Sequence, residues 1–262
     1  MNSEADLRYW KSKMAVGRMA YGAGMFRLAA RHFMKAKELI HERNLPESTL
    51  SPTLVSLAKS LGSFGQFNDA EPLLQEALKI DESAAASDPE LCVELIEDYH
   101  QLSLLYWRAG KPDLARAPLD RAFSLLKNHP DVPDDLTSKL LKHRAVLAEI
   151  SGDFELCEKS INEAIDFILQ SKDLGKHSLI YGDCLLVKVT LLTEFGRYDE
   201  AIELYREAMQ ILAMIRGDAH PKMLESLEGL AALASKKGLE RAAANLQQRA
   251  DHVKADLRKK GF

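Results

Sequence analysis

Apolar residues recur along this chain at steps of three and four positions, separated by short polar segments. The clearest example follows Gly24, with an aromatic residue at Phe26 and then Ala29, Phe33 and Ala36. These steps place four side chains on one face of an α-helix, and glycine suits the turn that precedes it. Related patterns follow five more glycines, which are spaced at nearly equal intervals along the chain: Gly65, Gly110, Gly152, Gly196 and Gly238.

A second amphipathic segment precedes each of these glycines, with apolar residues at i, i+3, i+4 and i+7. The segment 54–61 is one copy of it. Arg144 and Lys188 occupy the second apolar position in two other copies, where we expect the helix to pack with a rotated face. The repeated unit is therefore a helical hairpin with an apolar side that only a stacked neighbour can cover.

The repeats predict an all-α fold, a right-handed superhelical solenoid of six helical hairpins that forms a single domain over residues 1–262. The last segment, 239–260, is polar along most of its length, and we expect it to cap the stack. Composition agrees with this fold class, because 41 leucines stand against only 8 valines. Such an excess of unbranched over β-branched residues favours helices over strands.

Charge and hydropathy exclude several classes of partner. The chain carries 35 Lys+Arg and 39 Asp+Glu, a net charge of -4, whereas domains that bind nucleic acid are usually strongly basic. No apolar run approaches the roughly 20 residues that span a bilayer, so we expect no membrane insertion. The N-terminal segment does not resemble a signal peptide, and we expect a cytoplasmic protein.

Motifs that carry chemistry are not found in the sequence. It contains no glycine-rich phosphate-binding loop, no serine nucleophile motif and no His-Glu-x-x-His metal motif. The three cysteines are odd in number and show no Cys-x-x-Cys spacing, which argues against a disulfide framework or a zinc site. We therefore expect a protein that is not an enzyme, with no catalytic residues, no bound metal and no cofactor.

The repeated residues resemble those of the tetratricopeptide repeat (TPR) family over nearly the whole chain. The long repeat period, seen for example from Gly110 to Gly152, and the stretch 217–221 (Gly-Asp-Ala-His-Pro) are similar to the longer repeats of the kinesin-light-chain type. The resemblance implies a protein-interaction scaffold in which the first helix of each hairpin lines a concave groove. Ser56 and Gln101 stand at two positions where kinesin-type repeats tend to have asparagine, so the cargo of that type is not carried over.

Family geometry places one group of polar and aromatic residues in this groove, across the third and fourth repeats. Trp and Arg are enriched at binding hot spots, and the cations of the first four repeats outnumber the acids. The candidate groove residues are Lys59, His100, Gln101, Leu104, Trp107, Arg108, Lys142, His143 and Val146. Two other interpretations remain open: the charges form a solvated face without function, or Trp107 packs against the next repeat.

The sequence thus favours a non-catalytic adaptor that holds a partner peptide or helix in its concave groove. The partner expected is a protein or peptide, and the positive groove positions favour an acidic one. Two alternatives stay open at this point: a peptide-sensing regulatory protein, and an assembly factor of a secretion or envelope complex.

Overall fold

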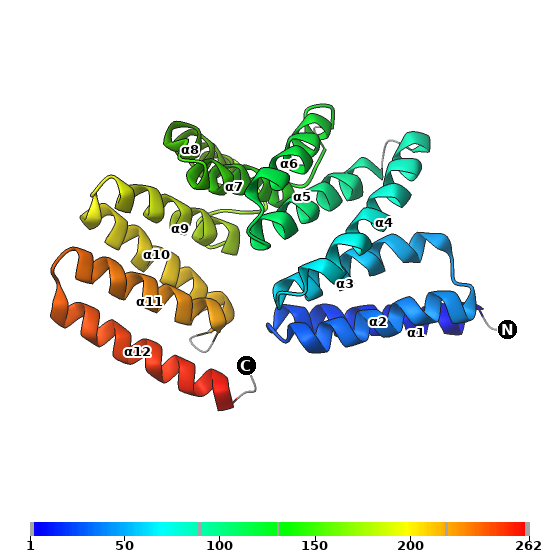
Figure 1. Cartoon of the computed structure of the whole chain (residues 1–262), viewed down its shortest axis with the longest axis horizontal. Helices are drawn as coiled ribbons and strands as arrows, with labels where there is room; N and C mark the ends of the chain where they lie inside the picture. The colour runs from blue at the N-terminus through cyan, green and yellow to red at the C-terminus, as the bar shows by residue number, and fades with distance from the viewer. Residues whose placement is uncertain (1–2, 89–90, 130, 218–219, 260–262) are drawn as a thin grey trace. The chain divides into compact units, whose positions relative to one another are not determined.

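The structure, a computed structural model, describes residues 3–88, 91–129, 131–217 and 220–259. Within these ranges the regular elements are helical and no strand is present. Figure 1 labels the twelve α-helices of this described part: α1 (Ser3–Gly22), α2 (Phe26–Arg43), α3 (Leu50–Ser63), α4 (Phe67–Ser87), α5 (Cys92–Arg108), α6 (Pro112–Leu126), α7 (Asp134–Ile150), α8 (Phe154–Gln170), α9 (Leu179–Glu194), α10 (Tyr198–Arg216), α11 (Pro221–Lys236) and α12 (Glu240–Lys259). A 3-10 helix, Glu47–Thr49, precedes α3.

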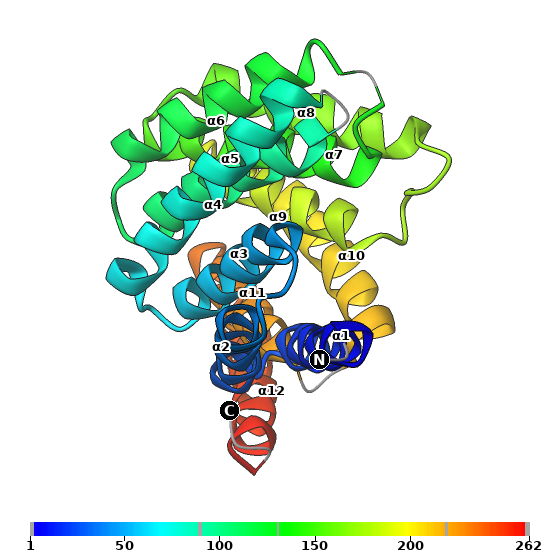
Figure 2. The ribbon, with the colours of Figure 1, turned by 90° about the vertical axis from the view of Figure 1, so that its right-hand side faces the viewer.

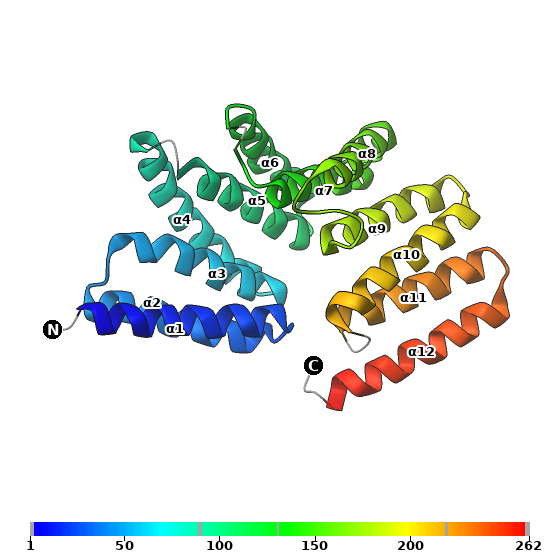
Figure 3. The same cartoon turned by 180° about the vertical axis from the view of Figure 1, so that it is seen from behind.

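The chain divides into two compact units, Met1–Val132 and Pro133–Phe262. In the first unit α1 packs on α2, α3 on α4 and α5 on α6, while α2 and α4 contact the first helix of the next hairpin. Figure 2 shows α1 and α2 nearly end on, lying side by side. The second unit repeats this order with α7 to α12, which Figure 3 shows as three successive hairpins.

These hairpins confirm the predicted all-α solenoid. The single domain over residues 1–262 and the right-handed superhelix through all six hairpins stay predictions. The predicted cap, 239–260, corresponds to α12, with residue 260 outside the described ranges. Residues 218–219 of the stretch 217–221 also lie outside them.

The six predicted glycines mark the turn between the two helices of each hairpin, and all six have φ between 71° and 88°. At Gly65, the Gly65 N–H donates to the Gly62 carbonyl (3.3 Å) and the Gln66 N–H donates to the Leu61 carbonyl (3.0 Å). This is the hydrogen-bond pair of a Schellman motif, which needs a left-handed residue at its centre. A Cβ on Gly65 would meet no atom within 4 Å, so the preference for glycine here is conformational and not steric.

Small residues bring the two helices of a hairpin close together. Ala29 and Ala36 of α2 are fully buried, and Phe33 between them is also inside. A Cβ on Gly17 of α1 would lie 2.5 Å from Cε1 of Phe33, so the ring occupies the space that glycine leaves. The alternation of small and large residues in the repeat therefore fixes how closely α1 and α2 approach.

The two cations at expected apolar positions are satisfied by polar groups of α8. The Arg144 side chain donates to Ser160 (2.9 Å) and pairs with Glu163 (2.6 Å), and Lys188 donates to Asn162 (2.9 Å). α8 thus offers polar partners to α7 on one side and α9 on the other. The departure from the repeat pattern is explained by these contacts.

Overpacking at an alanine of the repeat should destabilise the protein. Ala70 of α4 is fully buried, so the larger side chain in Ala70→Leu has no free space to occupy. The change should lower the free energy of unfolding by about 1–3 kcal/mol. Urea denaturation followed by circular dichroism measures this loss. Ala86→Leu, on the exposed side of the same helix, is the control and should stay within about 0.5 kcal/mol of the original chain. Equal effects of the two changes would contradict the repeat packing.

Candidate functional site

The predicted groove residues are carried by the first helices of three hairpins. Lys59 lies on α3, and five others lie on α5. Both helices belong to the first unit, whereas the three residues on α7 belong to the second unit. The structure therefore forms two separate sets, and one groove across the third and fourth repeats stays a prediction.

Four of the predicted residues meet in the first unit. Lys59 of α3 lines a small crevice together with Gln101, Leu104 and Arg108 of α5. The crevice has a volume of about 20 Å³, which is room for about one water molecule. α3 and α5 approach closely beneath it, since a Cβ on Gly62 would lie 2.8 Å from the Leu105 side chain. The four side chains form a shallow surface with one crevice and not a deep groove.

Trp107 and Val146 are half-buried, whereas the two predicted histidines are not surface residues. His100 is only 3% exposed and His143 only 1%, so the expectation that they line an open groove is wrong. The reason is helical register, because His100 lies four residues after Ile96, on the buried face of α5. His143 lies among the buried residues of α7.

Two of the three cations predicted to attract an acidic partner already form ion pairs within the chain. Lys59 forms an ion pair with Glu97 of α5 (3.2 Å). Lys142 of α7 forms one with Asp183 of α9 (3.0 Å). Arg108 differs, because it is exposed and donates to the neutral hydroxyl of Ser63 at 3.3 Å. No ion pair to Arg108 is found among the residues that the structure describes, so its charge is the one most available to a ligand.

One carboxylate joins the three first helices of the second unit. Asp183 of α9 accepts from Lys142 of α7 (3.0 Å) through one oxygen and from Lys222 of α11 (2.9 Å) through the other. Burial raises the pKa of Asp183, but the two ammonium groups outweigh it and hold the pKa below its usual value. These contacts are charge-assisted hydrogen bonds, which are stronger than neutral ones. Sequence reasoning missed this cluster.

A signal for the cluster does exist in the sequence. Lys142, Asp183 and Lys222 each precede the glycine of their own repeat, at Gly152, Gly196 and Gly238. The separation from the glycine grows by three positions from one repeat to the next, so the three side chains lie on a diagonal across the stack. Comparing the same position in every repeat cannot detect a diagonal.

A second buried carboxyl group lies in the first unit, between α3, α4 and α5. Ser51 of α3 donates to Asp81 of α4 (2.6 Å), and Asp81 is hydrogen-bonded to Asp98 of α5. Burial and then the neighbouring Asp81 raise the pKa of Asp98 to about 9. Asp98 is thus protonated at neutral pH, as a hydrogen bond between two carboxyl groups requires.

The structure shows little that could support metal, redox or nucleophilic chemistry. In the described part of the chain, no three His, Cys, Asp or Glu side chains come together in a way that could hold a metal ion. All three cysteines are buried, and burial raises the pKa of Cys157 to about 11 and that of Cys184 to about 12. Those two thiols stay protonated and unreactive at neutral pH. None of the described helices is long and apolar enough to cross a membrane.

Family models match two parts of the chain. Residues 53–83 and residues 184–250 each match a model described as Tetratricopeptide repeat. The helical hairpins and the glycine turns of the structure agree with these matches in indicating tetratricopeptide repeats. The chain contains tetratricopeptide repeats (TPR).

Several solved structures have a similar fold, each with low sequence identity to this chain. BtubC (BKLC) from P. vanneervenii is 19% identical, with a TM-score of 0.63 over 98% of this chain and 91% of its own. A Podosopora anserina protein with kinesin light chain nearly identical TPR-like repeats is 18% identical, with a TM-score of 0.57 over 79% and 96%. The Rap conjugation gene regulator of plasmid pLS20, bound to the Phr* peptide, is 15% identical, with a TM-score of 0.71 over 98% and 77%. These likenesses show the fold of this TPR protein and nothing finer.

One curated relative matches part of the sequence. The RxLR effector protein SFI4 of Phytophthora infestans is 28% identical over 116 residues, which cover 44% of this TPR protein. The match spans about a third of that relative's own length (34%). It therefore shows a partial similarity in sequence.

Removing the shared carboxylate should destabilise the second unit. In Asp183→Asn, Lys142 and Lys222 lose their charged acceptor, which should cost about 1–3 kcal/mol of unfolding free energy. Thermal denaturation measures the loss, and it should be smaller at high salt because repulsion between the two ammonium groups is screened. Glu225→Gln, on an exposed position of α11, is the matched control. A change no larger than that of the control would contradict the shared-carboxylate interpretation.

Asp98 should make stability fall as the pH rises. Its folded-state pKa of about 9 lies above the usual aspartate value of 3.8, so the folded chain binds one more proton than the unfolded chain between these values. The unfolding free energy should then decrease from about pH 4 to pH 9, by at most about 1.4 kcal/mol per pH unit. Asp98→Asn should remove this slope, whereas the exposed Glu76→Gln should keep it. Urea denaturation at several pH values measures both, and identical slopes in the two variants would contradict the assignment.

Proposed function

We propose that this TPR protein is a non-catalytic scaffold that binds a segment of a partner protein on the first helices of its hairpins. The observation that carries the proposal is the meeting of Lys59, Gln101, Leu104 and Arg108 at one surface of the first unit. The four come from two helices, and Trp107 lies one residue before Arg108 on the same helix. An apolar residue, an amide, a cation and an indole together can bind a peptide through both apolar and polar contacts.

The partner segment that we propose carries an acidic residue. Arg108 is exposed and its hydrogen-bond acceptor, Ser63, is neutral. A carboxylate of the partner could therefore bind Arg108 without displacing an existing ion pair. Lys59 is less suitable, since Glu97 already neutralises it. The sequence suggested that several cations attract the acidic partner, whereas the proposal rests on Arg108 alone.

The solved relatives supply a class of ligand. One is the Rap regulator in complex with the Phr* peptide. Another is the APC/C hetero-tetramer Cut9-Hcn1, which is 14% identical with a TM-score of 0.67 over 93% of this chain and 40% of that one. The first structure is a complex with a peptide, and the second is an assembly of protein subunits. The first of these also favours the second candidate function, a regulatory protein that senses a peptide.

Two substitutions on α5 test the proposal. The partner is first isolated with the intact chain by affinity purification and mass spectrometry, and its binding to each variant is then titrated. Trp107→Ala should weaken binding by about 2 kcal/mol at all salt concentrations, because the indole contributes apolar contact area. Arg108→Glu should weaken binding chiefly at low salt, because its contribution is electrostatic.

The control is Arg116→Glu, which reverses an exposed charge on α6. It should leave the affinity unchanged, and circular dichroism should show all three variants folded. If Trp107→Ala unfolds the protein, the indole belongs to the core and Arg108→Glu alone decides the question. Full affinity in a folded Arg108→Glu variant at low salt would refute the proposed surface.

A further inference from the structure

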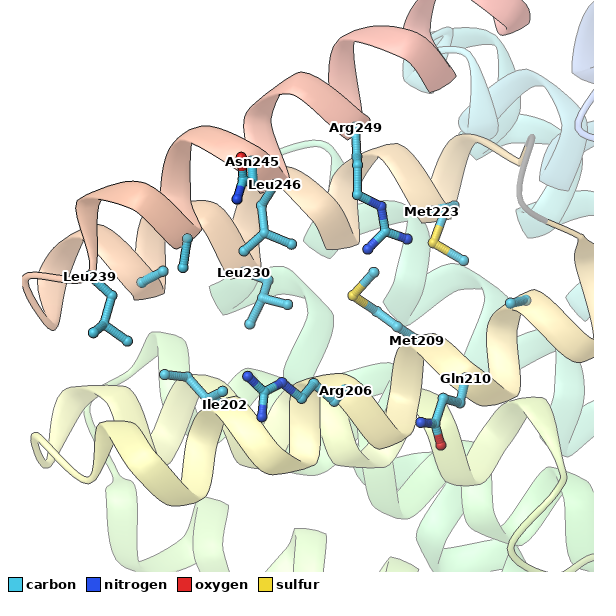
Figure 4. Close-up of a pocket in the computed structure, with 13 residues that line it drawn as sticks. Ile202, Arg206, Met209, Gln210, Met223, Leu230, Leu239, Asn245, Leu246 and Arg249 are labelled. Atoms are coloured by element: carbon cyan, nitrogen blue, oxygen red, sulfur yellow. The ribbon is translucent and has the colours of Figure 1, made fainter.

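The second unit contains a cavity that the proposed function does not use. It has a volume of about 510 Å³ and lies between α10, α11 and α12. Figure 4 shows it as a trough, with α10 and α12 as its walls and residues of α11 between them. The volume is within the range of ligand-binding pockets, about 300–1,000 Å³.

Small residues on all three helices leave this space open. Ala213 of α10, Ala234 of α11 and Ala242 of α12 all line the trough. Most of the larger lining side chains are apolar: Ile202, Met209, Met223, Leu230, Leu239 and Leu246. Met223 and Leu230 are buried in the apolar clusters beneath the trough. The trough is thus an apolar surface supported by the core of the second unit.

The charged residues that line the trough are all positive. Arg206 stands on α10 and Arg249 on α12, and none of the lining residues is acidic. In Figure 4 the Arg249 side chain extends from α12 toward Met209 on the opposite wall. No carboxylate in the described part of the chain pairs with Arg249. Arg206 pairs with Glu203 (2.7 Å), but both side chains are more than 60% exposed, so this pair contributes little and is easily displaced.

The trough is long enough for a chain-like ligand. Its α10 wall runs from Ile202 to Ala213, about 16 Å along the helix. Its volume of about 510 Å³ is that of a site for a small molecule, so a slender chain can lie along it. The other candidate occupant is a helix of a partner, and the experiment below includes it.

An extended peptide suits the chemistry of the trough less well than a hydrocarbon chain does. Each of its residues would bring one N–H and one C=O group that need hydrogen-bond partners when buried. The polar lining groups are only the side chains of Arg206, Gln210, Asn245 and Arg249. A hydrocarbon chain needs no such partners.

We propose that this trough binds an anionic amphiphile. Its hydrocarbon chain lies between α10 and α12 over α11, and its carboxylate or phosphate head group binds to Arg249 and Arg206. Burial of the chain supplies affinity, up to about fourfold for each methylene group. The guanidinium groups select the charge of the head group. The site lies in the second unit, so it is independent of the surface around Arg108.

Two probes with the same chain and opposite charge test the proposal on the full chain. Dodecanoate and dodecyltrimethylammonium are titrated by calorimetry, each below the concentration at which it forms micelles. Dodecanoate should bind once per chain, at least tenfold more tightly than dodecyltrimethylammonium. Octanoate should bind at least tenfold more weakly than dodecanoate, since it buries four fewer methylene groups.

Three variants locate the binding. Ala242→Phe places a ring in the trough from an exposed position and should abolish dodecanoate binding. Arg249→Gln should weaken dodecanoate about fivefold or more and leave dodecyltrimethylammonium unchanged. Arg241→Gln, an exposed arginine beside the trough that does not line it, is the control and should bind as the original chain does. Circular dichroism and the melting temperature check that each variant is folded.

Several outcomes would overturn the proposal. They are the absence of saturable dodecanoate binding, equal affinity for both head groups, and unchanged binding in the folded Ala242→Phe variant. A synthetic amphipathic helix of leucine and glutamate is a further probe. If it binds at the trough while dodecanoate does not, the occupant is a protein helix and the proposal is wrong.

Discussion

Close contact between helices at small residues is the constraint on which the rest of this structure depends. Ala29, Ala36 and Gly17 bring α1 and α2 together around the ring of Phe33, and buried alanines recur at the same positions in the other hairpins. Interiors of proteins are packed as densely as organic crystals, so such contacts leave little freedom of distance. Within each unit, a hairpin then packs on the next hairpin along the chain.

Much of the fold could be predicted from the sequence because its determinants are local. The glycines are required by φ between 71° and 88°, and the alanines by close packing, so both occur at regular intervals that a reader of the sequence can find. The positions of Lys59, Gln101, Leu104 and Arg108 on facing first helices also follow from the repeat. Periodicity states which residues share a face and, in a stack, which faces meet.

The parts that could not be predicted are the burial of individual side chains and the contacts between repeats, which the periodicity of the sequence does not determine. His100 and His143 are polar, which suggested that they lie at the surface. Their positions along α5 and α7 place them on the buried faces of these helices. The partner of Lys142 comes from another repeat at a shifted position, which comparison of equivalent positions cannot reveal. The trough in the second unit arises from three alanines on three helices, each ordinary in its own segment. Such features depend on tertiary contacts between residues far apart in the sequence.

The shared carboxylate of Asp183 also has a mechanical consequence. Its two oxygens hold Lys142 of α7 and Lys222 of α11 at the same time, while its own helix, α9, lies between theirs in the chain. Spreading α7, α9 and α11 apart on this side must therefore stretch two charged hydrogen bonds that meet at one residue. The second unit should be stiff toward opening on that side, and protonation of a single group would soften both connections together. Flexing of the stack is in this way linked to the charge of one side chain.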